Sequence, residues 1–137
     1  MQVVDVLILG AGAAGMMCAI EAARRGRRVA VLDHGRAPGE KIRISGGGRC
    51  NFTNLSTAPE RFLSQNPRFA LSALARFTPA DFIARIDAAG IAWHEKTLGQ
   101  LFCDGKSGQI IAMLRDEMER AGADLWLRTS VVEVAHD

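Results

Sequence analysis

The residues from Gly10 to Gly15 read Gly-Ala-Gly-Ala-Ala-Gly and match the G-x-G-x-x-G pattern of dinucleotide-binding loops. An apolar, β-branched run from Val3 to Leu9 precedes them, and an Ala- and Met-rich stretch begins at Ala13. Asp33 follows about 20 residues later, at the end of a second apolar run. This spacing predicts a strand, loop and helix that bind a diphosphate at the helix N-terminus, with the carboxylate on a ribose.

Each glycine of the pattern has its own physical role. Gly10 allows the tight turn, Gly12 lets the backbone approach a pyrophosphate, and Gly15 permits close packing of the helix on the strand. A carboxylate at Asp33 repels a 2′-phosphate and therefore disfavours NADP. Arg36 keeps NADP open as an alternative.

A second cluster lies between residues 39 and 54 and combines glycine with positive charge. Its three consecutive glycines, Gly46 to Gly48, expose backbone N–H groups, and Lys41, Arg43 and Arg49 add cations. A flavin needs such groups near N1 and O2, where negative charge accumulates on reduction. A flexible surface loop is the alternative, because glycine with Ser and Asn is ordinary loop composition.

The first 55 or so residues resemble the aminoacetone oxidase family of FAD-binding proteins, which includes bile-acid steroid reductases. The resemblance rests on Lys41, on the run from Ser45 to Asn51, and on Thr53-Asn54. The segments 99–103 and 107–120 resemble the continuation of that family. FAD is therefore the expected cofactor, with NAD(P)H as a further expected electron donor.

The resemblance also implies a set of cofactor-binding residues. The glycine loop would hold the pyrophosphate, Asp33 would bind the ribose where the family usually has Glu, and Val132, in an expected strand 130–134, would lie beside the adenine. The expected set is Gly10, Gly12, Ala13, Ala14, Gly15, Asp33, His34, Lys41, Ser45, Gly46, Gly47, Gly48, Arg49, Cys50, Asn51 and Val132.

The expected fold class is α/β, an incomplete Rossmann-like FAD/NAD(P)-binding unit with a parallel sheet, further helices and a short β segment. Residues 1–35 would form the βαβ nucleotide unit, 36–56 a glycine-rich flavin loop, and 57–137 the continuation of the domain. The expected strands are 3–9, 28–33, 91–95, 100–103, 124–128 and 131–135, with a brief extended stretch at 41–44, and the expected helices are 13–25, 59–65, 67–76, 79–89 and a helix capped by Ser107 that runs to 121.

Composition excludes several classes of protein. The net charge of +2 argues against a nucleic-acid partner, and the first apolar run is too short to span a membrane. Cys18, Cys50 and Cys103 are odd in number and widely spaced, which argues against a disulfide scaffold or a zinc site and favours a cytoplasmic location. No metal site is expected.

The function expected from these features is that of an FAD-dependent oxidoreductase, with hydride transfer through flavin N5 from NAD(P)H or a small-molecule substrate. The remainder of the parent polypeptide would be needed to complete the site, and no catalytic residue is assigned. Two alternatives stay open, an NAD-binding Rossmann protein without flavin and a non-catalytic nucleotide-binding module. Cys50 is interpreted as a packing or positioning residue in preference to a redox thiol.

Overall fold

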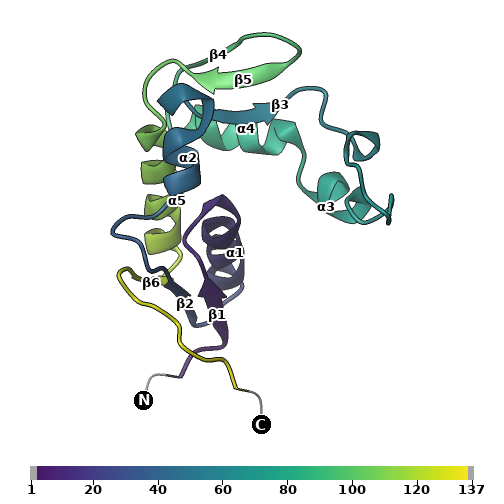
Figure 1. The fold of residues 1–137 in the computed structure, drawn as a ribbon. Helices are drawn as coiled ribbons and strands as arrows, with labels where there is room; N and C mark the ends of the chain where they lie inside the picture. Colours follow the sequence, from purple (N-terminus) through teal and green to yellow (C-terminus); the bar gives the residue numbers. More distant parts are fainter. Residues whose placement is uncertain (1–2, 136–137) are drawn as a thin grey trace.

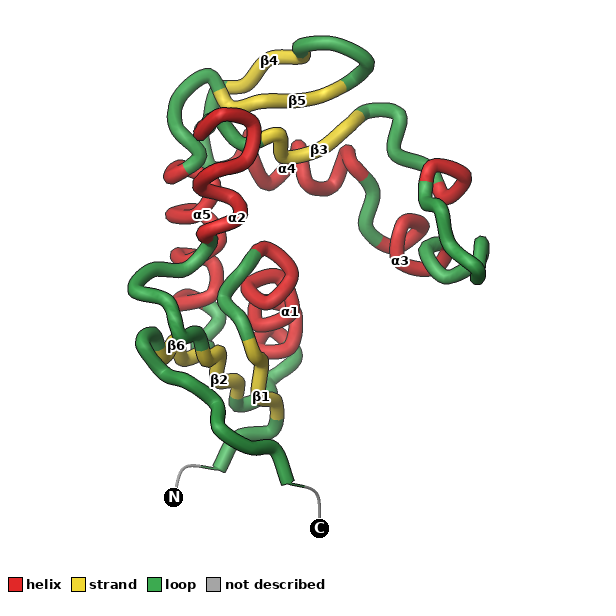
Figure 2. Tube along the Cα trace, in the orientation of Figure 1, coloured by secondary structure: helices red, strands yellow, loops and turns green. Residues whose placement is uncertain are grey.

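The computed structural model describes residues 3–135 and contains two small sheets joined by helices (Figures 1 and 2). The strands are β1 Val6–Leu9, β2 Val29–Leu32, β3 Asn51–Asn54, β4 Trp93–Glu95, β5 Gln100–Cys103 and β6 Asp124–Trp126. The helices are α1 Ala13–Arg24, α2 Glu40–Ile44, α3 Leu71–Arg76, α4 Pro79–Ala88 and α5 Gly108–Arg120, with 3-10 turns at Ser45–Gly48 and Pro59–Arg61. The predicted α/β Rossmann-like class is confirmed.

The first sheet is parallel and has the strand order β1-β2-β6. Helices α1 and α5 pack against each other and against this sheet through one apolar core that includes Met16, Ile20, Leu114 and Met118. The connections from β1 to β2 and from β2 to β6 each contain helix, as parallel pairing requires. The carboxyl ends of β1 and β2 therefore meet at the same edge of the sheet, where the glycine loop begins.

The two faces of β1 have different surroundings. Val6 and Ile8 are partly buried against the core, whereas Leu7 and Leu9 are 53% and 55% exposed. Successive side chains of a strand point to opposite faces, so α1 and α5 cover only one face of the sheet. In the described part of the chain, the other face of β1 has no covering layer.

The second sheet is antiparallel, with the order β3-β5-β4, and α4 packs on it. Phe52 of β3 contacts the rings of Phe82 and Trp93 at centroid distances of 6.1 and 6.3 Å. Helix α4 begins directly after its N-cap Thr78, which forms a reciprocal capping box with Asp81. The predicted helix at 79–89 is thus confirmed, with its end one residue earlier.

The glycine-rich segment is more regular than predicted. Residues 41–44, expected to be extended, belong to α2, because Gly39 adopts the left-handed conformation at its start and Ile42 packs into the core. An ion pair joins Glu40 and Arg43, which are neighbours on the helix surface at positions i and i+3. The Arg43 Nε lies 2.9 Å from the Glu40 Oε2. Residues 51–54, expected as loop, form β3.

Several predicted elements are shorter or absent. The first strand begins at Val6, the helix at 59–65 reduces to the turn Pro59–Arg61, and the helix at 67–76 reduces to α3. The predicted strand at 131–135 is wrong, because the backbone after β6 leaves the sheet through Arg128, whose φ is 54°. No helix in the part of the chain seen here has the length and apolarity needed to cross a membrane.

Candidate functional site

The glycine loop follows β1 and leads directly into α1, as predicted. Gly10 has φ 102°, in the left-handed region that favours glycine, and a Cβ at Gly15 would overlap the Gly10 carbonyl oxygen. At Gly12, by contrast, an added Cβ would meet open space. Gly10 and Gly15 are therefore required by the fold, whereas Gly12 leaves room for a ligand.

The N-terminus of α1 is free to bind an anion. Its N-cap, Gly12, offers no side-chain hydrogen bond, and the first turn contains no acidic residue. Backbone N–H groups at the start of a helix have no intrahelical partner and carry the positive end of the dipole. A diphosphate would supply the missing acceptors.

Two adjoining cavities share the side chains of Asp33 and His34 at the carboxyl edge of the parallel sheet. One has a volume of about 540 Å³ and is lined by Ala11, Gly12 and Lys41. The other has a volume of about 420 Å³ and is lined by Gly10 and the segment 129–131. Together they form an elongated site that suits a ligand with phosphate and nucleoside parts.

The Asp33 carboxylate organises this edge. Its Oδ2 accepts a hydrogen bond from the Ala11 N–H group, and its Oδ1 accepts one from the Gly35 N–H group, both at 2.7 Å. These bonds, first that from Ala11, hold the pKa of Asp33 below its usual range. The carboxylate thus stays ionised at neutral pH, and its remaining lone pairs can accept ribose hydroxyls.

Two cations in the larger cavity are available to phosphate. Arg36 and Lys41 line it, and neither forms an ion pair within residues 3–135. The acidic groups there are already engaged, since Glu40 pairs with Arg43 and Asp33 accepts backbone hydrogen bonds. The local field therefore favours an anion.

The triple-glycine turn is ordered by its own backbone and by β5. Gly46, Gly47 and Gly48 have φ values of 57°, 66° and 86°, and Cys50 has φ 54°. A Cβ at Gly46 would lie 2.6 Å from the Phe102 ring, whereas one at Gly47 would meet open space. Glycine is required here, and Gly47 exposes backbone to a ligand.

Ser107, at the start of α5, holds this turn in place. Its backbone N–H donates to the Gly48 carbonyl and its hydroxyl donates to the Arg43 carbonyl, both at 2.8 Å. The residue is buried, with 2% exposure. Ser107 occupies the predicted N-cap position, but its hydroxyl bridges to α2 and does not cap α5. These hydrogen bonds argue against the alternative of a flexible surface loop.

Cys50 and Cys103 are buried thiols next to the turn. The Cys103 N–H donates to the Arg49 carbonyl at 3.0 Å, which brings the two cysteines onto neighbouring segments. Burial raises the pKa of Cys50, and burial, followed by the nearby Cys50 and Asp104, raises the pKa of Cys103 to about 11. Thiols held in the protonated form are poor nucleophiles, which supports a packing role.

The structure brings only some of the predicted residues together. Gly10, Gly12, Asp33, His34 and Lys41 line the paired cavities. Ala13 and Ala14 begin α1 and line a different cavity, and the run Ser45 to Asn51 lies beyond the C-terminal end of α2. Val132 is 98% exposed and lies outside any strand, although the neighbouring segment 129–131 lines the second cavity.

Some residues of the site were missing from the predicted set. Ala11 and Gly35 donate to Asp33, Arg36 lines the larger cavity, and Ser107 anchors the turn. Ala11 is the first variable position of the glycine pattern. Its backbone N–H donates to the side chain of Asp33, which is shorter than the Glu that the family usually has there. The contact of Ser107 with Arg43 joins residues 64 positions apart, for which the sequence carries no local signal.

These features fit an FAD molecule. The open space at Gly12, the free N-terminus of α1 and the two cations suit its diphosphate, and the adjoining cavity at Asp33 suits its adenosine half. The exposed Gly47 backbone at the far end of α2 suits the polar edge of the flavin ring.

Two curated relatives match all or nearly all of the chain. The ribosomal RNA dihydrouridine synthase of Escherichia coli (strain K12) is 57% identical over 137 residues, which are 100% of this chain and 34% of that protein. The protein of the same name from Haemophilus influenzae (strain ATCC 51907 / DSM 11121 / KW20 / Rd) is 51% identical over 97% of this chain and 33% of its own length. The chain spans about a third of the length of these curated relatives.

The resemblance to bile-acid reductases is also confirmed over part of the chain. The 3-dehydro-bile acid delta(4,6)-reductase of Clostridium scindens (strain ATCC 35704 / DSM 5676 / VPI 13733 / 19) is 38% identical over 72 residues, 51% of this chain and 18% of that protein. Among solved structures, the open conformation of a flavocytochrome c3 fumarate reductase matches 98% of this chain and 28% of its own, with 22% identity and a TM-score of 0.63. At this identity, the likeness to the fumarate reductase shows a shared fold alone.

The expectation of no nucleic-acid partner is wrong for this group of proteins, because the two relatives that match almost the whole chain are named for ribosomal RNA. The net charge of +2 was the basis of that expectation. A net charge averages over the surface and over only a third of such a protein, so it does not show where basic residues gather.

The profile of the HI0933-like protein Rossmann domain matches residues 4–137. This match includes the glycine loop, Asp33 and the triple-glycine turn. The chain therefore belongs to the HI0933-like Rossmann domain family.

Proposed function

We propose that this chain is the FAD-binding part of a flavin-dependent enzyme that reduces uridine in ribosomal RNA to dihydrouridine. The observation that carries the proposal is the 57% identity to a ribosomal RNA dihydrouridine synthase over the whole chain. The paired cavities at Asp33 and the ordered triple-glycine turn support FAD as the cofactor.

In the overall reaction, NAD(P)H and one proton are consumed, the C5–C6 double bond of the uracil ring becomes a single bond, and NAD(P)⁺ is released. When bound, FAD supplies a ring that accepts two electrons from the nicotinamide and passes them to the pyrimidine. We propose NAD(P)H as the electron donor.

The residues of this chain bind FAD and orient it. The N-terminus of α1 holds the diphosphate, with Arg36 and Lys41 as counter-charges. Asp33 binds the ribose while its carboxylate keeps the glycine loop in place. The backbone N–H of Gly47 would donate to the polar edge of the ring. Groups that protonate the uracil are assigned to the remainder of the polypeptide.

The experiment uses the full-length protein. Its visible spectrum and the ligand released by heat are determined first, and FAD is expected. The protein is then incubated with NADPH and ribosomal RNA from cells that lack the enzyme, and dihydrouridine is measured by mass spectrometry of the digested nucleosides. New dihydrouridine is the expected result.

Gly12→Ala is the matched variant, because it fills the ligand space without disturbing the fold. It should lose FAD and product together. A yellow wild-type protein that forms no dihydrouridine with either NADH or NADPH would overturn the RNA substrate but leave FAD binding intact. A colourless wild-type protein that binds NAD would instead favour a Rossmann protein without flavin.

A further inference from the structure

Residues 55–77, here named the arm, differ in surface character from the rest of the chain. The arm joins β3 to α4 and extends to one side of the body formed by α1, α2 and α5 (Figure 1). Every residue from Arg61 to Phe69 is exposed. The arm holds three arginines and one glutamate, so its net charge of +2 equals that of the whole chain.

Aromatic rings are interleaved with this positive charge. Phe62 and Phe69 are 40% and 54% exposed, and their rings meet edge to face at a centroid distance of 6.1 Å. Arg61 and Arg68 each precede one of these phenylalanines. Exposed aromatic rings among cations are typical of surfaces that bind single-stranded nucleic acid, where bases stack and phosphates pair with cations.

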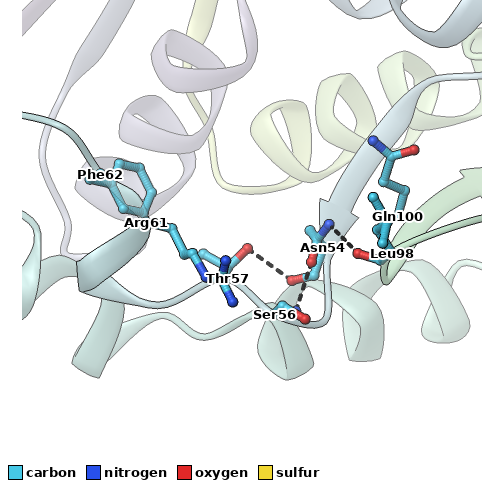
Figure 3. Close-up of a pocket in the computed structure, with 7 residues that line it drawn as sticks. All are labelled: Asn54, Ser56, Thr57, Arg61, Phe62, Leu98 and Gln100. Atoms are coloured by element: carbon cyan, nitrogen blue, oxygen red, sulfur yellow. Dashed lines mark hydrogen bonds between the residues drawn. The ribbon is translucent and has the colours of Figure 1, made fainter.

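The arm also forms one wall of a cavity of about 510 Å³ (Figure 3). Arg61, Phe62 and Thr57 line it from the arm, and Leu98 and Gln100 line it from the β4–β5 turn and β5. In Figure 3 the Phe62 ring lies at one end and the Gln100 amide at the other. This cavity is separate from the two cavities at Asp33.

The polar groups of the cavity differ in their availability. Asn54 is engaged, since its Nδ2 donates to the Leu98 carbonyl at 2.9 Å and its Oδ1 accepts from the Ser56 N–H group at 2.7 Å. The Arg61 guanidinium and the Gln100 amide, by contrast, have no hydrogen-bond partner among the residues described. Asn54 therefore shapes the cavity and leaves a cation and an amide for a ligand.

We propose that this cavity binds a short single-stranded stretch of the RNA substrate, with one base against Phe62, a phosphate on Arg61 and the edge of a neighbouring base on Gln100. The inference rests on the proposed function and locates an RNA contact outside the FAD site. The chemistry matches each part of a nucleotide, since an amide recognises a base edge, an aromatic ring stacks on its face and a guanidinium pairs with phosphate. A purely apolar partner would leave the charge and the amide without partners.

The test measures binding of a fluorescein-labelled single-stranded oligouridine of about 10 nucleotides to the full-length, FAD-loaded protein by anisotropy. Phe62→Ala should weaken binding by about 10-fold or more, and Phe62→Trp should retain it. Arg61→Ala should lower the slope of log K against log salt by about one.

Two matched controls separate RNA contact from other roles. Leu63 is 99% exposed and does not line the cavity, so Leu63→Ala should bind like the wild type. Arg27 is an exposed arginine after the C-terminal end of α1, whereas residues of the arm line a cavity together with the first residues of α1. Arg27→Ala should therefore keep the wild-type salt slope. The flavin spectrum should be unchanged in all variants.

Equal losses in Phe62→Ala and Leu63→Ala would overturn the proposal and assign the arm to contact with protein. Wild-type affinity in Phe62→Ala and Arg61→Ala would overturn it as well. If Phe62→Ala does not fold, Phe62→Trp and Arg61→Ala still decide the question. Failure of the proposed function is distinguishable, because the wild-type protein would then bind oligouridine but form no dihydrouridine in ribosomal RNA.

Discussion

The carboxylate of Asp33 and the backbone N–H of Ala11 are joined by a hydrogen bond of 2.7 Å. This bond connects the end of β2 to the glycine loop after β1, across the carboxyl edge of the parallel sheet. Asp33 therefore has two places in the site, because the same carboxylate that lines the paired cavities also fixes the loop proposed to hold the diphosphate.

Asp33→Asn is predicted to weaken both the loop and FAD binding. The amide keeps one acceptor oxygen but turns an NH₂ group toward a backbone N–H donor, at a cost of about 1–3 kcal/mol in the free energy of unfolding. FAD affinity should fall with it, measured by quenching of flavin fluorescence. Asp33→Glu is the charged control and should retain most of the affinity.

The effect of Asp33 should depend on pH in one direction. Its pKa is lowered in the fold by the N–H groups of Ala11 and Gly35, so its stabilisation is present above the unfolded value of about 3.9 and is lost as pH falls through the folded value. The difference in unfolding free energy between wild type and Asp33→Asn should be constant near neutral pH and shrink below about pH 4. A difference that grows in acid would contradict this assignment.

Gly12→Ala and Gly15→Ala are predicted to fail in different ways. At Gly15 the new Cβ would overlap the Gly10 carbonyl, so the free energy of unfolding should fall by about 3 kcal/mol. At Gly12 the backbone has an ordinary φ of −80° and the Cβ meets open space, so stability should be unchanged while FAD affinity falls at least about 10-fold. Denaturant unfolding and flavin titration separate the two effects, and equal stability losses would contradict the role given to Gly12.

Ser107→Ala is predicted to loosen the triple-glycine turn. It removes the hydroxyl donor to the Arg43 carbonyl, which should cost about 1 kcal/mol in stability and increase hydrogen exchange at residues 45–49. Ser72 is exposed on α3 and makes no side-chain hydrogen bond among the residues described, so Ser72→Ala is the matched control. Unchanged exchange in Ser107→Ala would show that the backbone bond from Ser107 to Gly48 suffices.

The sequence predicted the β1–α1–β2 unit well because its signals are local. An apolar run, a glycine loop and an Ala- and Met-rich stretch lie next to one another, and Gly10 and Gly15 are required by the backbone where the pattern places them. The capping box at Thr78 is equally local and was equally predictable. Such patterns report on backbone geometry within a few residues.

The errors arose where distant contacts decide the conformation. Residues 51–54 become a strand because β5 pairs with them about 50 positions later in the chain, with Asn51 opposite Phe102. Residues 131–135 are rich in valine but have no strand beside them among the residues described. Strand propensity without a partner does not form a sheet. The role of Ser107 likewise depends on tertiary contact.

The buried cysteines are predicted to be unreactive at neutral pH. Cys18 is exposed and should react with iodoacetamide at about pH 8, whereas Cys50 and Cys103 are buried and hold raised pKa values. Because protonated thiols are favoured in the fold, their stabilisation is present below the unfolded pKa of about 8.5 and is lost as pH rises toward the folded pKa of Cys103, about 11. Peptide mass spectrometry after brief alkylation of the full-length protein measures the three rates. Labelling of Cys50 as fast as Cys18 would contradict the packing role and identify a thiolate beside the triple-glycine turn.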